Sequence, residues 1–574
     1  MRVLLVSSAF NSLTQRVHAE LREDGHIVSV HLAVGSDDLL RDAVARFEPQ
    51  LIIAPMLTRA IPRDVWSSHT VLIVHPGPIG DQGPSSLDWA ILNGRTQWGV
   101  TVLQAVEEMD AGDVWASVPF TVAACGKSEL YRTEAADAAS EAVRLAVARY
   151  QNGSFTPKPV APDRRHARPF LRQEARRIDW TVDSSEVVVR KLRAGDSQPG
   201  VLDELFGDEY FLHGGHPEDE LRGPAGAVLA TRDGAICRAT TDGAVWIPRL
   251  RRRRLPDGTA GFKLPATDVL GAALAGIPEV AVTPAAAAVR ETWSQIRYRQ
   301  QGRVGFLEFS FPDGAMSTEQ CRQLLDAYKD ACRRPTRVLV LGPERDFFSN
   351  GIHLHVIEGA QDPAAESWAN INAMDDLVQE ILHTTDRIIV SALAGNAAAG
   401  GLMLSLAADQ VWCRGSAVLN PHYRLMGLYG SEFWTYTLPR RVGKEAARRL
   451  TTAALPVGAQ EALGIGLVDR VITGNPRNFR AIVAREAIHL AAQPQWNDLI
   501  TAKQLQIRLH GPEMENHRKY ELARMQDNFF DPTQPYHALR RDFVRKVRPA
   551  GPPEYLAEPA GPVDLFSVNA AMST

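Results

Sequence analysis

Cysteine is scarce in this sequence, and neither sign of charge dominates it. The five cysteines are widely spaced and never form Cys-x-x-Cys, so we expect neither a disulfide framework nor a zinc site. Lys and Arg number 63 against 67 Asp and Glu, and the net charge of −4 leaves no global basic field to draw the chain onto nucleic acid. These features favour a cytoplasmic protein with no nucleic-acid partner.

Long apolar runs are also missing. The apolar run nearest the N-terminus, Val3–Val6, is too short for the core of a signal peptide. No later stretch approaches the 18 consecutive apolar residues of a membrane span. We therefore expect neither export nor a membrane span. The apolar share of 45% and the charged share of 23% are ordinary for folded proteins, and 574 residues exceed what one hydrophobic core normally organises. Several folded domains are expected.

Short β-branched or leucine-rich segments alternate with helical ones at the start of the chain. The predicted strands are 3–6, 27–32, 51–54 and 71–74. This alternation predicts a parallel sheet whose ligand crevice lies at the carboxyl ends of the strands, where loops 7–14 and 75–86 would lie. A helix over 129–150 should close the domain, with Ala135, Ala138, Ala142, Leu145 and Ala146 on one buried face.

The pattern changes twice further along the chain. Residues 152–169 are rich in proline and arginine and are typical of a linker. From 178 to about 274, short strands with Asp-Gly turns predict a small β-rich domain. After an alanine-rich segment at 284–289, a second α/β pattern begins, with strands predicted over 304–309, 338–341 and 388–392.

The first chemical motif is a strand that ends at His75 and continues into a glycine- and proline-rich loop; Asp110 lies in a later Met-Asp-Ala-Gly segment. Taken singly, such a histidine is more often a core or capping residue, and such an aspartate a turn residue. Together they resemble the 10-formyltetrahydrofolate-dependent transferases, the family of methionyl-tRNA formyltransferase, over about the first 275 residues. The resemblance implies that His75 and Asp110 are catalytic. It also matches the Arg-Ile-Asp-Trp segment at 177–180 to the segment that opens the family's small β-barrel domain.

One position departs from that family. Its catalytic asparagine corresponds to Ile73, which cannot donate to an oxyanion, and such a donor contributes about 3 kcal/mol in comparable sites. An amine acceptor is therefore disfavoured, whereas a thiol, which is easier to activate, stays open. The resemblance implies that the folate pterin lies near Leu57, Thr58, Arg59 and the Asp110 loop.

The second motif combines two segments, 345–354 after a predicted strand and 394–409 at a strand-to-helix turn. Glycines that open a helix present free backbone N–H groups to a negatively charged atom. Together the segments resemble the crotonase (enoyl-CoA hydratase/isomerase) superfamily, from about 297 to 473. The resemblance implies that the amides of Ile352 and Gly400 form an oxyanion hole, and that Gly351 and Gly401 belong to the coenzyme A site.

The two catalytic glutamates of the hydratases correspond to Met403 and Tyr423. Neither side chain can activate water, so hydration of an enoyl thioester is not expected. Tyr423 and Glu432, nine residues later, could instead form an acid/base pair. The alternatives are a packed tyrosine with a hydrogen-bonded hydroxyl and a glutamate that supplies charge at a helix N-terminus. The catalytic interpretation is preferred because both residues fall in the superfamily's catalytic stretch.

A folate formyl donor and a thioester pocket share one compound, formyl-CoA, and the pairing resembles the hydrogenase maturation factors of the HypX/HoxX family. The resemblance implies transfer of formyl from 10-formyltetrahydrofolate to coenzyme A, followed by decarbonylation of formyl-CoA to CO and CoA. The CO would become an iron ligand of a nickel–iron hydrogenase, whose large subunit or maturation machinery is a candidate partner. No metal is expected in the protein itself.

Two alternatives stay open. One is a formyltransferase with a different acceptor, fused to a thioesterase- or decarboxylase-like crotonase. The other is a non-catalytic assembly protein that docks onto the hydrogenase, with both enzyme folds as relics.

Coenzyme A that serves both sites would have to reach between domains. The polar candidates for binding it are Gln15, Arg132, Ser197, Arg545 and Arg548, each of which would be an ordinary surface residue if considered alone.

The expected fold class is α/β throughout. It comprises a Rossmann-like formyltransferase domain over 1–158, a small OB-like β-barrel over 170–275, a linker over 276–294, a crotonase-type ββα-spiral domain over 295–550 and a tail over 551–574.

Overall fold

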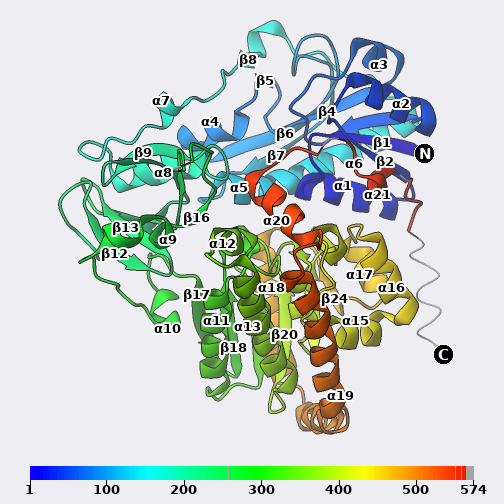
Figure 1. Ribbon diagram of the computed structural model, residues 1–574. Coiled ribbons are helices and arrows are strands. Elements are labelled where there is room, and N and C mark those ends of the chain that lie inside the picture. Colours follow the sequence, from blue (N-terminus) through cyan, green and yellow to red (C-terminus); the bar gives the residue numbers. More distant parts are fainter. Residues whose placement is uncertain (256, 550, 558, 564–574) are drawn as a thin grey trace. The chain divides into compact units, whose positions relative to one another are not determined.

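The computed structural model describes residues 1–563 other than 256, 550 and 558 (Figure 1). These residues form two compact units: the first contains Met1–Val280 and the segment from Arg548 to 563, and the second contains Ala281–Val547. Of the predicted tail, residues 564–574 lie outside the described residues. No helix of the described chain combines the length and apolar character needed to cross a membrane.

The first unit begins with a six-stranded sheet in the order β2-β1-β3-β4-β6-β7. Its strands are β1 (Arg2–Ser7), β2 (Ile27–Leu32), β3 (Leu51–Ala54), β4 (Val71–His75), β6 (Gln97–Gln104) and β7 (Val114–Thr121). The first four strands pair in parallel, and β6 and β7 are antiparallel. All four predicted strands are confirmed, which places the His75 loop at the carboxyl edge of the sheet.

Helices cover the sheet because alternate strand residues point to opposite faces. Helix α2 (Asp37–Phe47) packs Leu40, Val44 and Phe47 on one of these faces. Helices α1 (Ser12–Glu23) and α6 (Ala136–Asn152) pack against each other, and α6 also contacts β6 and β7.

The helix predicted over 129–150 differs from the one observed. Helix α5 (Lys127–Leu130) and a π-helical turn, η1 (Tyr131–Ala135), precede α6. The four predicted alanines are buried, but Leu145 is 38% exposed, so its assignment to the buried face was wrong. The stripe that faces the sheet continues through Val143 and Val147, which leaves Leu145 at its edge.

The remainder of the first unit contains two four-stranded antiparallel sheets, in the orders β16-β15-β10-β9 and β11-β14-β13-β12. Their strands are β9 (Val201–Leu205), β10 (Asp208–His213), β11 (His216–Glu218), β12 (Val228–Arg232), β13 (Ala235–Ala239), β14 (Ala244–Ile247), β15 (Arg249–Arg252) and β16 (Leu264–Pro265). Both sheets and helix α8 (Ser185–Gly195) contribute to one apolar core. The predicted β-rich region is confirmed.

The second unit is built on a six-stranded sheet in the order β17-β18-β19-β20-β22-β24, in which only β17 and β18 pair antiparallel. The strands are β17 (Ile296–Gln301), β18 (Val304–Phe309), β19 (Val338–Gly342), β20 (Ile388–Leu393), β22 (Gln410–Arg414) and β24 (Arg470–Ile472). One face packs on α11 (Thr318–Cys332) and α13 (Pro363–His383), the other on α18 (Pro476–Ala491).

A 35-residue helix, α19 (Trp496–Phe530), was not anticipated from the sequence. It runs along α13 and also contacts α15 (Trp434–Val442), as Figure 1 shows in orange-brown. Most of α19 is polar and exposed, so its amphipathic signal is weak. One of its buried residues is Glu521, whose carboxyl group lies inside the unit beside α13 and α15.

The turn that opens helix α14 (Gly400–Leu406) depends on a close backbone approach. A methyl group at Gly401 would overlap the carbonyl of Ser349. We expect Gly401→Ala to lower the stability of the protein by roughly 1–3 kcal/mol, as overpacking does. Chemical denaturation followed by fluorescence would measure this.

The matched control is Gly561→Ala, at an exposed glycine of the C-terminal segment of the first unit, where an added methyl meets nothing within 4 Å. That variant should be unchanged or more stable by up to about 1 kcal/mol, because alanine lowers the conformational entropy of the unfolded chain. Equal stabilities of the two variants would contradict the assigned role of Gly401.

Candidate active sites in two units

His75 ends strand β4 with its imidazole buried between two carboxylates. Its Nδ1 lies 3.4 Å from Oδ2 of Asp110, and its Nε2 lies 3.1 Å from Oδ2 of Asp81. A side chain at Gly77 would overlap both His75 and Asp81, so glycine is needed there. The structure thus joins the two predicted residues and adds a third group, so that each ring nitrogen faces a carboxylate oxygen.

Asp81 was not singled out from the sequence, although it lies in the loop that follows His75. It belongs to the short strand β5 (Asp81–Gln82), which pairs with β8 (His166–Ala167). Arg168, directly after β8, donates a hydrogen bond to Asp81. Burial raises the pKa of Asp81, but hydrogen bonds with His75, Ser86 and Arg168 outweigh it and leave the pKa below its usual value. The stretch predicted to be only a linker therefore supplies the counter-charge of this site.

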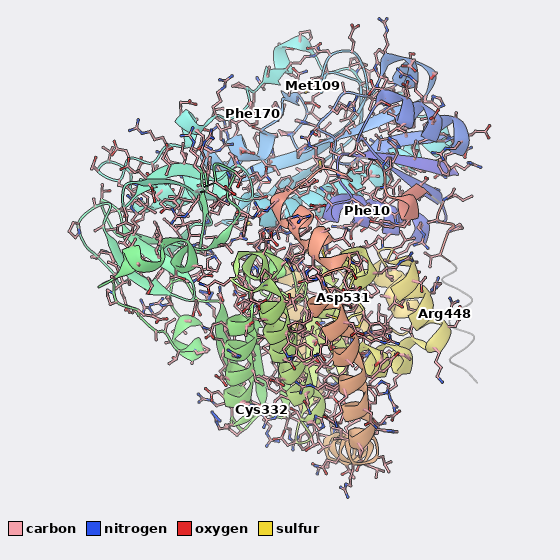
Figure 2. All side chains as sticks on the ribbon, viewed as in Figure 1. Phe10, Met109, Phe170, Cys332, Arg448 and Asp531 are labelled. Atoms are coloured by element: carbon pink, nitrogen blue, oxygen red, sulfur yellow. The ribbon has the colours of Figure 1, made fainter. Side chains whose placement is uncertain are left out.

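Asp110 lies in a tight turn with a left-handed backbone, at φ 53°. The amide of Gly83 donates to its Oδ2 over 3.1 Å, which ties the two loops of the site together. Met109, immediately before it, is 66% exposed at the surface (Figure 2). The turn thus directs Asp110 inward while its neighbour faces solvent.

His75 and Asp110 border a cavity of about 440 Å³. This volume lies within the usual range for small-molecule sites. Its lining includes Leu57, Thr58 and Arg59, the residues predicted to lie near the pterin, as well as Ile73. Arg59 also pairs with Asp37 over 2.5 Å. The predicted folate contacts and the catalytic candidates thus share one cavity.

Three of the coenzyme A candidates lie on adjoining segments of the first unit but outside the lining of that cavity. Gln15 is on α1, and Arg132 is in η1; Asn11 of α1 donates to Tyr131 of η1 over 3.1 Å. Ser197 precedes Gln198, whose carbonyl accepts from Lys127 of α5 over 2.9 Å.

The two C-terminal candidates, Arg545 and Arg548, belong to different units. In the second unit, Arg545 ends helix α20 (Tyr536–Arg545) and lies 3.6 Å from Glu358. Arg548 is exposed and opens the C-terminal segment of the first unit.

In the second unit, Tyr423 and Glu432 meet as a buried pair. The Tyr423 hydroxyl lies 2.6 Å from Oε2 of Glu432, and the amide of Ser431 donates to the same oxygen over 3.1 Å. Tyr423 comes from a short 3₁₀ turn, η5 (Tyr423–Met426), and Glu432 from the turn before α15. The structure brings together the two residues that the sequence analysis named as an acid/base pair.

The predicted oxyanion hole lies at the same place. A methyl group at Gly400 would overlap the Glu432 carboxylate, and one at Gly351 would lie 3.2 Å from the amide nitrogen of Gly400. Within the described residues, no hydrogen bond uses the N–H of Ile352 or Gly400. Two available donors thus lie beside the Tyr423–Glu432 pair, as a thioester carbonyl would require.

Burial controls the ionisation of this pair. It raises the pKa of Tyr423 well above the usual value, with the neighbouring Glu432 adding to the effect. Burial, followed by the charge of Asp375, raises the pKa of Glu432 to about 8. Asp375, on α13, was not anticipated from the sequence, because it lies 57 positions from Glu432.

The comparisons with known proteins match each unit to a known family. The formyl transferase family model matches residues 34–147, the model of the formyl transferase C-terminal domain matches 171–256, and the enoyl-CoA hydratase/isomerase model matches 300–537. The hydrogenase maturation factor HoxX of Bradyrhizobium diazoefficiens is 47% identical over 554 residues, which are 95% of each chain. The chain belongs to this family of hydrogenase maturation factors.

Two further relatives support the assignment. The crystal structure of HypX from Aquifex aeolicus in complex with tetrahydrofolic acid has a TM-score of 0.93 and 43% identity, and the match covers 97% of this chain and 98% of that one. Methionyl-tRNA formyltransferase of Bacillus licheniformis is 23% identical over 240 residues, 40% of this chain and 76% of the other. Both family resemblances and the α/β fold class are therefore confirmed.

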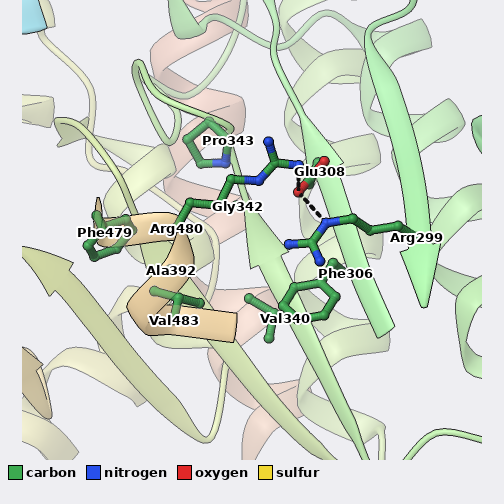
Figure 3. Close-up of a pocket in the computed structure, with 10 residues that line it drawn as sticks. All are labelled: Arg299, Phe306, Glu308, Val340, Gly342, Pro343, Ala392, Phe479, Arg480 and Val483. Carbon is green, nitrogen blue, oxygen red and sulfur yellow. Dashed lines mark hydrogen bonds and ion pairs between the residues drawn. The ribbon is translucent and has the colours of Figure 1, made fainter. Parts of the chain in front are cut away.

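A small cleft of about 30 Å³ lies on the opposite face of the second unit's sheet, towards α18 (Figure 3). Arg299 and Arg480 both contact Oε1 of Glu308, over 3.0 and 2.7 Å, and Arg480 also pairs with Glu344. The charged side chains of the cleft therefore pair with one another, and the cleft gives no reason to infer a bound ligand.

The raised pKa of Glu432 predicts a stability that depends on pH. A carboxyl whose pKa is higher in the folded state stabilises the fold below its unfolded pKa of 4.5, and this contribution is lost as the pH rises through about 8. Thermal unfolding should therefore show a smaller decline in Tm across this range for Glu432→Gln than for the wild type.

The control is Glu515→Gln, at a glutamate of α19 with a 44% exposed side chain. It should keep the wild-type slope of Tm against pH. A Glu432→Gln slope equal to that of the wild type would contradict the prediction.

Proposed function

We propose that this protein makes carbon monoxide for a nickel–iron hydrogenase in two steps, in the cytoplasm. The first unit transfers formyl from 10-formyltetrahydrofolate to the thiol of coenzyme A. The second unit converts formyl-CoA to CO and CoA. The observation that carries the proposal is the buried Tyr423–Glu432 pair beside two backbone donors, in a chain whose other unit has a formyltransferase site.

In the first step the CoA sulfur attacks the formyl carbon, the bond from that carbon to folate nitrogen breaks, and the nitrogen takes a proton. His75 is the group placed to move protons, and Asp110 and Asp81 orient it from either side. Ile73 lines the cavity where other family members carry an amide donor. The thiol acceptor fits this loss, because a thiolate needs less assistance than an amine.

In the second step the formyl C–H proton passes to the Tyr423–Glu432 pair. The C–S bond then breaks with its electron pair on sulfur, which releases CO, and the pair returns the proton to the thiolate. One group must therefore act as base and then as acid. A pKa of about 8 for Glu432 lies close to the ordinary thiol value of about 8.5, so the return of the proton to the thiolate is nearly balanced.

Met403 supports a reaction without water. It is fully buried in α14, at the position of a hydratase glutamate, and packs in the same apolar core as Tyr423. An apolar side chain there leaves no second carboxylate to orient a water molecule. Little of the formyl thioester should then be lost to hydrolysis before it releases CO.

The first test of the proposal uses the whole protein with 10-formyltetrahydrofolate and CoA. We expect CO, detected by its capture on reduced haemoglobin, and no CO when CoA is omitted. Formate in place of CO would instead identify a thioesterase-like second unit. The absence of any turnover, with hydrogenase maturation intact, would identify an assembly protein.

The second test separates the two sites with formyl-CoA supplied directly. Tyr423→Phe should lower CO release at least about 100-fold, the usual contribution of a general acid or base. Asp110→Asn should release CO from formyl-CoA at the wild-type rate but make none from 10-formyltetrahydrofolate.

The matched control is Tyr429→Phe, at a nearby half-buried tyrosine whose ring packs at a tilt against Trp434, and it should keep both activities. The assignment of the second step fails if Tyr423→Phe releases CO from formyl-CoA at the normal rate.

A further inference from the structure

The turn that carries Glu432 has an unusual backbone. Glu432 and Phe433 are consecutive residues in the left-handed region, at φ 61° and 58°. Residues other than glycine rarely adopt this conformation, and each costs about 1–3 kcal/mol unless its surroundings impose it. Without this turn, Glu432 would not point back at Tyr423.

Asp375 of α13 holds the first half of the turn. Its carboxylate is fully buried and accepts from the amide of Glu432 over 2.8 Å. The hydroxyl of Ser431 lies 2.8 and 3.0 Å from its two oxygens. These contacts attach the backbone of Ser431 and Glu432 to α13.

Glu521 of α19 holds the second half. It accepts from the amides of Phe433 and Thr435 over 2.9 and 2.7 Å, and also from the Thr435 hydroxyl. These amides belong to the first turn of α15, whose N–H groups have no partner within the helix. The two carboxyl groups together accept from the amides of both strained residues and of Thr435.

Of these two carboxyls, Asp375 is the source of negative charge near Glu432: burial raises the pKa of Asp375 to about 7, whereas burial and the charge of Asp375 raise the pKa of Glu521 well above its usual value. Of the neighbouring basic side chains, Arg518 is 3.9 Å from Asp375 and binds mainly Asp376 and Gln379, while His517 contacts Thr435. The other titratable groups that face Glu432 are Tyr423 on η5 and Cys321 on α11, neither of which supplies positive charge. The negative charge near Glu432 is therefore only partly compensated.

We propose that Asp375 and Glu521 are positioning residues for CO release: both hold the strained turn that aims Glu432 at Tyr423, and the charge of Asp375 keeps a proton on Glu432 until the thiolate needs it. This inference rests on the proposed decarbonylation. It assigns a role to two side chains that lie 57 and 89 positions from Glu432 and belong to neither family motif.

The test is Asp375→Asn, which removes the charge but leaves an oxygen to accept from the amide of Glu432. We expect the rise of CO release with pH, measured with supplied formyl-CoA, to shift its midpoint down by about one pH unit, because a like charge near the carboxyl is gone. The matched control is Asp376→Asn, the next residue on α13, whose side chain is 52% exposed, and its midpoint should stay at the wild-type value.

A second readout does not depend on activity. The infrared band of the protonated Glu432 carboxyl, identified by its loss in Glu432→Gln, should titrate at lower pH in Asp375→Asn. An unchanged titration and midpoint, even with a lower rate, would overturn the inference and leave the proposed function standing. A wild-type protein that makes no CO would instead overturn the proposed function, while the infrared titration would still test the coupling of the carboxyls.

Discussion

The second unit is organised around the burial of the Glu432 carboxyl against the hydroxyl of Tyr423. A carboxyl removed from water must lose its charge, gain a cation or gain hydrogen bonds. Glu432 receives hydrogen bonds from a hydroxyl and an amide, and the charge that acts on it is that of a further carboxylate, Asp375. Its proton affinity therefore rises towards that of a thiol, which suits a reaction that removes one proton and returns it to sulfur.

In the first unit, by contrast, a buried carboxylate is kept in its charged form. His75 also lies among buried carboxylates, but Arg168 supplies a cation to Asp81, and the net effect is a lowered pKa of that carboxyl. Asp81 thus stays ionised and can orient the imidazole. The chain thus contains two clusters of buried carboxyl groups. Around His75 the negative charge is balanced by Arg168, and around Glu432 it is reduced mainly by protonation of the carboxyl groups. This difference corresponds to the two kinds of proton transfer proposed for the two sites.

The loss of the hydratase glutamates has a structural counterpart. Met403 fills its position with an apolar side chain in the core, and the second position carries Tyr423, whose hydroxyl reaches a glutamate from the next helix turn. The amides of Ile352 and Gly400, the proposed oxyanion donors, make no hydrogen bond within the described residues. In the proposed reaction these amides polarise the thioester carbonyl, while the side chains around it exchange a single proton in place of activating water.

Local sequence determined the parts of this protein that depend on short-range pattern. Four strands of the first sheet, the His75 loop, the helix opening at Gly400 and the pairing of Tyr423 with Glu432 all follow from motifs within a few residues. Tertiary structure decided what those motifs contact. Asp81 meets Arg168 because β5 pairs with β8, and Asp375 and Glu521 meet Glu432 because α13 and α19 pack beside α15. Such contacts join residues tens of positions apart, and a buried carboxylate is indistinguishable from an exposed one until packing removes it from water.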